Sequence, residues 1–402
     1  MAVPPIVALE MGTSKVCALV GEAREDGNIM LTGIGQCPSC GVRKGIIVDL
    51  ENIETCIRTA VQGAEQSGGV EIRQVYVALS GGHIHSIVNP GSVPVYDAQR
   101  GVTHDDIEEV RQIAKAIHLP HDVEVLHTIP QLYTVDDQGG VPNPDGMQGG
   151  KLSLDMLIIH CARNLLQNAV KAVQNVGLEV VDVAFGGLCS ALATLTQEQK
   201  ACGVVLIDLG GGATSVVVYA GGTIATADVL AVGGDHITND IALGFSISIK
   251  RAEYLKQESG SAIVDASTHF QRISIPPEVG FAPGSIAMSD LNTVINARVD
   301  EMFRMIRHDL EKKHLLLNLG AGIVLTGGGA RLRGVETAAE RVFEMPCSVG
   351  KPKNFSGVST AYEGPEYASL LGLIRYAARS ESRVEDKVSL KDLIGNLFGR
   401  RA

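Results

Sequence analysis

The chain has 402 residues and a formal charge of −11 at pH 7, a length that as a soft prior allows two to three domains. The negative charge argues against broad nucleic-acid binding, so we expect no nucleic-acid partner. No stretch of about 18 apolar residues is present to span a membrane as a helix, and the first residues lack the charged and apolar parts of a secretory signal.

The first predicted feature is a strand–turn–strand unit at residues 6–20, IVALEMGTSKVCALV. Two short apolar runs predict buried strands, and between them lie an acid, Glu10, and a turn of Gly12, Thr13 and Ser14. Glycine lets a backbone approach another molecule closely, and successive N–H groups in such a turn can bind an anion. A single turn of this kind is equally compatible with an ordinary hairpin.

The rest of the first 82 residues predicts a small α/β unit. Apolar runs predict strands at residues 29–36, 45–50 and 75–79, and helical spacing of apolar residues predicts a helix over 52–66. Shorter alternating runs then predict an inserted β/α subdomain at residues 83–160. Its helix over 105–116 should be capped by Thr103, with Asp106 at capping-box spacing.

Two groups of potential metal ligands occur in the sequence, a set of histidines and a pair of cysteines. Six histidines of the insert have spacings that match no zinc template, namely His83, His85, His104, His118, His121 and His127, and Cys37 and Cys40 have no second pair nearby. We therefore expect no metal ion bound directly by these side chains.

The second half opens with a hairpin that repeats the first. Residues 154–161 predict a return to the main sheet, followed by a helix over 164–176, a strand over 180–184 and a helix over 188–195. Residues 204–219, VVLIDLGGGATSVVVY, then again give strand, acid, glycine turn and strand. The acid is Asp208, and the turn holds Gly210, Gly211, Gly212 and Ala213.

Two such hairpins indicate duplicated halves that close on a phosphate-bearing nucleotide. Asp208 ends a strand, where a carboxylate can act on a hydrated Mg²⁺ ion, because Mg²⁺ keeps several waters and takes few protein carboxylates. Neither glycine turn opens an amphipathic helix, which excludes a Rossmann site, and the P-loop Lys-Ser/Thr pair is missing.

The remaining elements predict the other walls of a site. Gly234 precedes a helix over 237–243 with Asp235 as its N-cap, and Glu253 and Lys256 lie three apart on one helical face. That pair is either a surface ion pair or a polar wall for a ribose and base. A long helix over 291–317, a strand over 322–325 and a third glycine turn, Gly327, Gly328 and Gly329, follow. Helices over 335–343 and 367–378 close the lobe.

The C-terminal tail predicts a membrane anchor. A charged linker at 379–387 leads to residues 388–402, where one face of a helix would be apolar. The pattern fits an interfacial helix, and the alternatives are a helix docked on its own domain or a disordered end. The apolar stripe and the basic residues beside it are Leu390, Leu393, Ile394, Leu397 and Phe398, with Lys391, Arg400 and Arg401.

Three glycine turns in the order phosphate, phosphate, adenosine are typical of the actin, sugar kinase and heat-shock chaperone superfamily. Within it the chain resembles the FtsA family of bacterial cell-division proteins over nearly its whole length. The segments that carry the resemblance include VALEMGTSKVCALVG, EVLHTIPQLYTVDDQGGVPNPDGMQG, VGGDHITNDIA and AGIVLTGGGARLRG.

This resemblance implies an α/β, actin-like, two-lobed duplicated fold with an inserted β/α subdomain and a C-terminal amphipathic helix. The first lobe would cover 1–82 and 161–200, with the insert at 83–160. The second lobe would cover 201–378, with an outer subdomain at about 236–317, and helices over 185–195 and 367–373 would cross between the lobes.

The resemblance also implies the ligands. ATP and Mg²⁺ would lie between Gly12, Thr13, Ser14 and Lys15 on one side and the 210–213 turn and Gly234 on the other. Gly327–Gly329 would face the adenosine, with Glu253 and Lys256 on the base side and Glu10 and Asp208 on the metal–water side.

The implied role is in cell division. FtsA-like proteins form actin-like filaments on the cytoplasmic face of the cell membrane at the division site. They bind the C-terminal peptide of the tubulin-like protein FtsZ, and they recruit other division proteins. Arg298 stands at the family's matching arginine for the FtsZ peptide, although an arginine on a charged helix is ordinarily just solvated.

The chain departs from the family pattern at two positions. Glu10 stands where the family usually has aspartate, and Ala213 where threonine is common. A carboxylate arm one methylene longer displaces the hydrated metal, and catalytic geometry tolerates little displacement. We therefore expect slow or absent ATP hydrolysis. A related pilus-assembly ATP-binding protein and, less favoured, a small-molecule kinase are the alternative functions.

Overall fold

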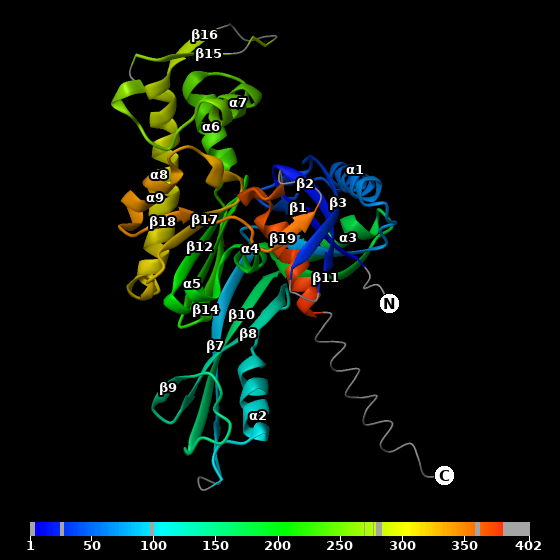
Figure 1. The fold of residues 1–402 in the computed structure, drawn as a ribbon, viewed down its shortest axis with the longest axis vertical. Helices are drawn as coiled ribbons and strands as arrows, with labels where there is room; N and C mark the ends of the chain where they lie inside the picture. Colours follow the sequence, from blue (N-terminus) through cyan, green and yellow to red (C-terminus); the bar gives the residue numbers. More distant parts are fainter. Residues whose placement is uncertain are drawn as a thin grey trace.

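A computed structural model describes residues 5–24, 28–96, 100–268, 270–275, 277–278, 284–357 and 362–380. Figure 1 shows an elongated molecule, with the inserted subdomain at the lower end and α6, α7, β15 and β16 at the upper end. Residues 381–402, which contain the predicted amphipathic tail and all but the first two residues of the predicted 379–387 linker, lie outside the described residues.

The first lobe is built on a sheet in the order β11-β6-β1-β2-β3-β19. Helix α1 (Leu50–Gly68) covers it and is capped by Asp49, whose side chain accepts from Asn52 N. Gly35 allows the close contact, because a Cβ there would lie 1.9 Å from the carbonyl oxygen of Ala60. The strands are β1 (Ile6–Met11), β2 (Lys15–Ala23), β3 (Ile29–Pro38), β6 (Gln74–Leu79), β11 (Glu179–Phe185) and β19 (Phe355–Gly357).

The prediction of a strand over residues 45–50 is wrong. Only a two-residue pairing forms there, between β4 (Val42–Arg43) and β5 (Ile46–Ile47), because Gly41 and Gly45 adopt positive φ and bend the chain. Helix α3 (Arg163–Gln174) corresponds to the predicted helix over 164–176, ends two residues earlier, and lies beside α1.

The insert is a separate sheet in the order β7-β10-β8-β9, with α2 (His104–Lys115) on one face. Thr103 and Asp106 form the predicted capping box. The prediction that residues 154–161 return to the main sheet is wrong, because they lie in β10, which pairs with β7 and β8 inside the insert. The strands are β7 (Ile84–Pro94), β8 (Val123–Val135), β9 (Gln138–Val141) and β10 (Lys151–Ala162).

The second lobe repeats the hairpin-led sheet in the order β14-β13-β12-β17-β18. Its strands are β12 (Val204–Leu209), β13 (Thr214–Ala220), β14 (Thr223–Leu230), β17 (Ile323–Thr326) and β18 (Cys347–Val349). Helix α9 (Val335–Phe343) lies between β17 and β18 in the chain and contacts β18. Helices α6 (Gly234–Phe245), α7 (Ile249–Glu258) and α8 (Met288–Lys312) and the β15 (Arg272–Ile275) and β16 (Gly284–Ala287) pair form its outer part.

One predicted cap is wrong. Asp235 lies inside the first turn of α6, and Gly233 is the N-cap residue, with its N–H donating to Nδ1 of His236 at 3.1 Å.

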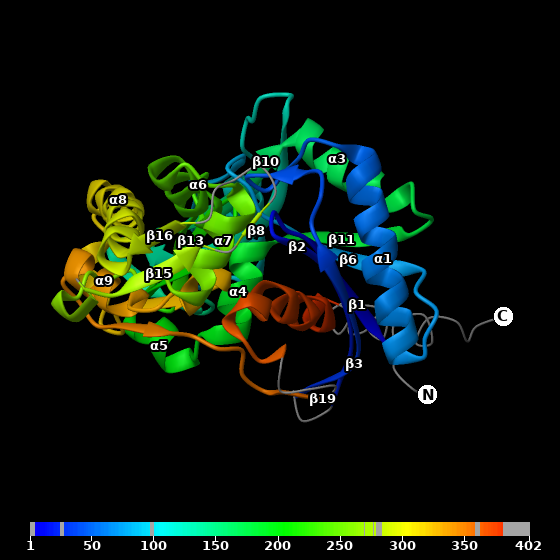
Figure 2. The same ribbon diagram turned by 90° about the horizontal axis from the view of Figure 1, so that it is seen from above.

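Two helices cross between the lobes, as predicted. They are α4 (Gly186–Thr194) and a helix over residues 368–380, which lie side by side in Figure 2. Their backbones approach closely, since a Cβ at Gly372 would lie 1.7 Å from the carbonyl oxygen of Cys189. The short α5 (Gln197–Cys202) then leads into β12.

The predicted second lobe ends too late, at residue 378. Strand β19 pairs with β3 of the first sheet, and residues 367–377 share a hydrophobic core with β1 and β2. The chain has therefore returned to the first lobe by residue 355.

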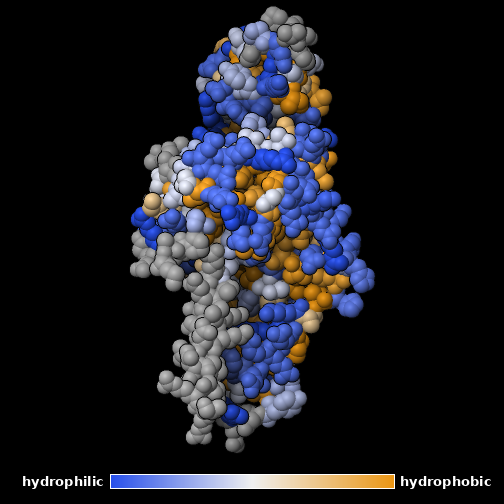
Figure 3. Space-filling model, turned by 90° about the vertical axis from the view of Figure 1, so that its right-hand side faces the viewer, coloured by the Kyte–Doolittle hydropathy of each residue, from blue (hydrophilic) through white to orange (hydrophobic). Residues whose placement is uncertain are grey.

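Figure 3 shows the side of the molecule that carries α1 and α3, where hydrophobic residues gather near the middle between hydrophilic ends. Within the described residues, every helix is too short or too polar to cross a lipid bilayer.

Candidate functional site

A cleft of about 660 Å³ lies between the lobes, within the about 300–1,000 Å³ common for ligand pockets. Every residue predicted for the nucleotide, together with the two predicted metal-side acids, lines it. These residues are Glu10, Gly12, Thr13, Ser14, Lys15, Asp208, Gly210, Gly211, Gly212, Ala213, Gly234, Glu253, Lys256, Gly327, Gly328 and Gly329.

The two glycine turns face each other across this cleft. Thr13 Oγ1 accepts from Gly45 N at 3.0 Å, which fixes the first turn. A Cβ at Gly212 would lie 2.5 Å from Thr13 Oγ1, and one at Gly211 would lie 3.3 Å from the Ser14 Cβ. Only glycine permits this approach at position 212, and the result is a cradle of backbone N–H groups suited to an anion.

Two carboxylates stand at the strand ends beside the turns. Asp208 accepts a hydrogen bond from Ser190 Oγ at 2.5 Å. Burial raises the pKa of Asp208 to about 6, partly offset by the Ser190 hydrogen bond. Burial and the Asp208 charge raise the pKa of Glu10 to about 7, while Lys15 acts in the opposite direction. The raised pKa values show that two negative charges are unfavourable in this buried site, and a bound cation would offset them. These residues therefore fit a hydrated Mg²⁺.

Lys15 has a second contact besides the cleft. Its Nζ lies 3.4 Å from the centroid of the Tyr367 ring, and burial lowers its pKa. The side chain is thus held by Tyr367, just before the 368–380 helix, while its backbone begins β2 directly after the first glycine turn.

The predicted base side of the cleft is a network of hydrogen bonds and one ion pair on α6 and α7. Lys256 and Glu253 form an ion pair at 2.7 Å, which confirms that the two lie on one face of a helix. Lys256 Nζ also donates to the Gly234 carbonyl at 3.1 Å and to Thr238 Oγ1 at 2.8 Å. Opposite lies the third glycine turn, where Gly327 has a φ of 80° and donates to the Pro365 carbonyl at 3.0 Å.

Several lining residues escaped prediction. Arg331 and Glu366 form an ion pair at 2.5 Å beside the third turn, and Ser190 reaches Asp208 from α4. Because these pairs join residues that are not neighbours in the chain, the spacing of residues in the sequence does not predict them. Asp235 and Gly45 also line the cleft. The sequence singles out Asp235, but it predicts a helix cap and not a lining residue.

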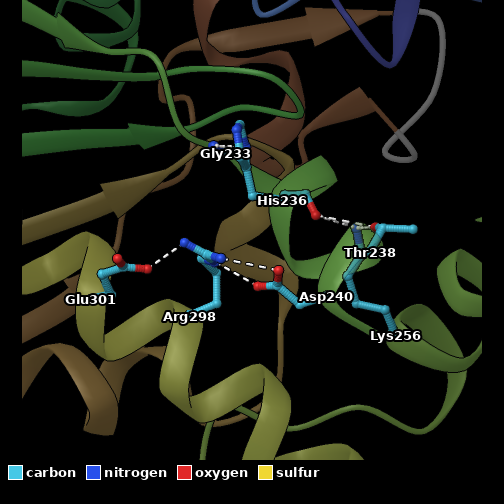
Figure 4. Close-up of polar contacts among 8 residues, drawn as sticks. Gly233, His236, Thr238, Asp240, Lys256, Arg298 and Glu301 are labelled. Atoms are coloured by element: carbon cyan, nitrogen blue, oxygen red, sulfur yellow. Dashed lines mark hydrogen bonds and ion pairs between the residues drawn. The ribbon is translucent and has the colours of Figure 1, made fainter. Parts of the chain in front are cut away.

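Arg298 lies away from the cleft, on α8. Its Nε and Nη2 donate to the two carboxylate oxygens of Asp240 on α6 at 2.6 and 3.0 Å, and its Nη1 contacts Glu301 (Figure 4). Arg298 is therefore not simply solvated. The predicted membrane residues of the tail lie outside the described residues.

Within the part of the chain that the structure describes, no three His, Cys, Asp or Glu side chains gather in a way that could hold a metal ion. Any Mg²⁺ in the cleft would then be held through water and the ligand's own phosphates.

Comparison with known proteins addresses the family directly. A family model described as "Cell division protein FtsA" matches residues 205–372, and one described as "SHS2 domain inserted in FTSA" matches residues 81–160. The cell division protein FtsA of Escherichia coli K12 is 35% identical over 395 residues, covering 96% of this chain and 94% of its own. The Pseudomonas aeruginosa protein is 36% identical over 377 residues, covering 94% and 90%. The chain belongs to the FtsA family.

Solved structures confirm the actin-like fold of this FtsA-family chain. A PilM–PilN type IV pilus biogenesis complex contains a chain with a TM-score of 0.65 and 19% identity, covering 92% of this chain and 97% of that one. MreB5 of Spiroplasma citri bound to ADP has a TM-score of 0.53 and 16% identity, covering 96% and 99%. The inserted subdomain is likewise confirmed by its own family match.

Proposed function

We propose that this FtsA-family chain is an ATP-binding cell-division protein that assembles into filaments on the cytoplasmic face of the cell membrane. There, at the division site, it tethers the FtsZ ring and recruits other division proteins. The observation that carries the proposal is the pair of phosphate-type hairpins, one per lobe, which face each other across a single cleft.

The residues present support ATP as the ligand. The N–H groups of Gly12 and Gly210 donate to carbonyls of their own turns, so those of Thr13, Ser14, Gly211 and Gly212 would contact the phosphates. Glu10 and Asp208 would orient the waters of Mg²⁺. Bound Mg²⁺ would neutralise phosphate charge. Glu253, Lys256 and the 327–329 turn would hold the ribose and base. Among structural neighbours, MreB5 is a protein solved with ADP and with AMPPNP.

The tail supports membrane tethering. Each fully buried apolar side chain of the 390–398 stripe would contribute on the order of 1.5–3 kcal/mol, and each basic residue near anionic lipid about 1 kcal/mol. Ordering a short helix costs roughly 1–2 kcal/mol per residue of backbone. One tail should then bind weakly, and many tails on one filament strongly.

Two other functions are less well supported. The pilus neighbour shares the fold, but at 19% identity against 35% for FtsA relatives. A kinase would need a general base aimed at a substrate hydroxyl, and would have no use for an amphipathic tail.

A flotation assay tests the tethering. Full-length protein should carry fluorescent FtsZ up a density gradient with anionic liposomes. The double variant Leu393→Glu/Leu397→Glu should leave FtsZ at the bottom, whereas Asn396→Glu, which adds charge on the polar face, should behave like the unmodified protein. Equal flotation of FtsZ with the double variant would rule out the tail as the anchor.

A further inference from the structure

Helix α6 is attached at its start to the phosphate-side turn. The N–H of Gly234 donates to the Gly210 carbonyl at 3.0 Å, and the N–H of Asp235 donates to the Gly211 carbonyl at 2.8 Å. A Cβ at Gly233 would lie 2.6 Å from both of those carbonyl oxygens, so the helix start and the turn are in direct contact. Any shift of the glycine turn must therefore move the first turn of α6.

The same helix is tied to the base side of the cleft. Thr238 Oγ1 accepts from Lys256 Nζ at 2.8 Å (Figure 4). Thr238 also contacts Glu253, and Lys256 also donates to the Gly234 carbonyl. The first two turns of α6 are thus held both by the 210–212 turn and by α7 of the same lobe. A regular helix transmits such constraints along its axis as a rigid rod, at about 1.5 Å per residue.

Asp240 lies on this helix, six residues after Gly234 and so about 9 Å along it. Both of its carboxylate oxygens accept from Arg298, in a two-pronged contact from Nε and Nη2. The side chains of Arg298 and Asp240 are 27% and 24% exposed, so one edge of the pair faces solvent. An arginine fork holds one carboxylate in this manner at a time.

We infer that Asp240 competes with a partner's carboxylate for Arg298, and that α6 links this competition to the nucleotide cleft. The inference rests on the proposed function, because it assumes that Arg298 contacts the FtsZ peptide. In the free protein Asp240 occupies the fork that an acidic peptide would need. When the peptide binds, its carboxylate replaces that of Asp240 on the Arg298 guanidinium. The position of α6 then determines the strength of the Asp240–Arg298 ion pair.

A purely structural ion pair would behave in the opposite way. If Asp240 only positions Arg298, removing its charge leaves the guanidinium poorly held and weakens peptide binding. If Asp240 competes, removing its charge frees the fork and strengthens binding. The direction of one affinity change separates the two roles.

The test measures binding of a fluorescent FtsZ C-terminal peptide to the full-length protein by anisotropy. Asp240→Asn should bind about twofold to fivefold more tightly, the scale of one partly exposed ion pair. Glu301→Gln, which removes the other acid on Arg298 but only a single contact, is the matched control and should change affinity less. Asp240→Ser is a second variant for the case that the asparagine amide of Asp240→Asn disturbs the helix packing, and it should also bind the peptide more tightly. Unchanged or weaker binding by both Asp240 variants overturns the inference.

Two further arms separate failure of the inference from failure of the proposed function. Arg298→Glu should abolish binding; if it does not, the proposed partner site itself is wrong. With a peptide whose acidic side chains and C-terminus are amidated, Asp240→Asn should give no gain. Adding ATP and Mg²⁺ should change affinity for the unmodified protein by about fivefold or more, and this change should vanish in Asp240→Asn. An equal nucleotide effect in both proteins overturns the link through α6.

Discussion

Glu10 and Asp208 come from different lobes, yet the charge of Asp208 affects the ionisation of Glu10. Each ends the first strand of its hairpin, and the charge of Asp208 helps raise the pKa of Glu10. Neither has an arginine or lysine ion pair among the described residues, apart from the through-space effect of Lys15. The two acids therefore store an electrostatic cost that a bound cation would relieve.

This cost predicts how stability depends on pH. The folded pKa values, about 7 for Glu10 and about 6 for Asp208, exceed the ordinary values of 4.5 and 3.8. Between about pH 4 and pH 7 the folded protein binds more protons than the unfolded chain, so its free energy of unfolding should fall as pH rises through that window.

Urea denaturation at several pH values checks this. The nucleotide-free protein should lose stability from pH 5 to pH 7.5, and Glu10→Gln should flatten the decline. Glu109→Gln, at an exposed position of α2, is the control and should not. A decline that is as steep in Glu10→Gln would show that Glu10 is not the group responsible.

The length of the Glu10 side chain makes a prediction for turnover. Its extra methylene displaces the waters around Mg²⁺, so ATP hydrolysis should be slow or absent. Glu10→Asp should raise the rate, measured by phosphate release with the full-length protein. Ordinary ATPase turnover in the unmodified protein, unchanged by Glu10→Asp, would contradict this reading.

At the scale of elements, the contact between β7 of the insert and β14 of the second lobe joins two domains. Ser86 N donates to Asp228 Oδ1 at 3.0 Å, and Ser86 Oγ accepts from Ala227 N at 3.0 Å. Lys313 of α8 pairs with Asp228 at 2.6 Å, and the hydrogen bonds from Lys313, Thr226 and Ser86 hold the pKa of Asp228 low in spite of its burial. This network ties the insert to the lobe that carries the 210–213 turn.

Loosening this joint should free the insert without unfolding it. Asp228→Asn should lower the free energy of unfolding by on the order of 1 kcal/mol and speed hydrogen exchange at the Ser86 amide. Asp309→Asn removes the other, more exposed acid on Lys313 and should do neither. Equal exchange at Ser86 in the two variants would mean that Asp228 does not hold the insert.

Elements with a local signal were predictable from sequence. The 204–219 hairpin, the Thr103 capping box and helix α9 depend on residues close in the chain, and each was confirmed. The strand over 154–161 was found but assigned to the wrong sheet, because a strand's sequence does not name its partner. The end of the second lobe was missed for the same reason, since β19 is only three residues long.

The candidate site divides along the same line. The glycine turns and their acids are local patterns, and the structure brings all of them to one cleft. The Ser190–Asp208, Arg331–Glu366 and Arg298–Asp240 contacts join side chains far apart in sequence. Their geometry depends on how the lobes and helices pack, which spacing alone does not determine.

At the scale of the whole molecule, two lobes meet through the crossed helices α4 and 368–380 (Figure 2). At Gly372 the two helices pack backbone against backbone with no room for a Cβ, so we expect them to stay together when the lobes move. The lobes should therefore move by rotating about this crossing, which opens or closes the cleft between the two glycine turns. A ligand that contacts both turns would stabilise one closed arrangement.

Calorimetric titration of the full-length protein with ATP in the presence of Mg²⁺ tests the central claim most directly. The account predicts one saturable site, lost in Gly212→Ala, because the added Cβ would lie 2.5 Å from Thr13 Oγ1. Gly139→Ala, where the nearest atom is 3.6 Å away, should bind normally. Absence of ATP binding by well-folded protein, or undiminished binding by Gly212→Ala, would contradict a nucleotide held between the two turns.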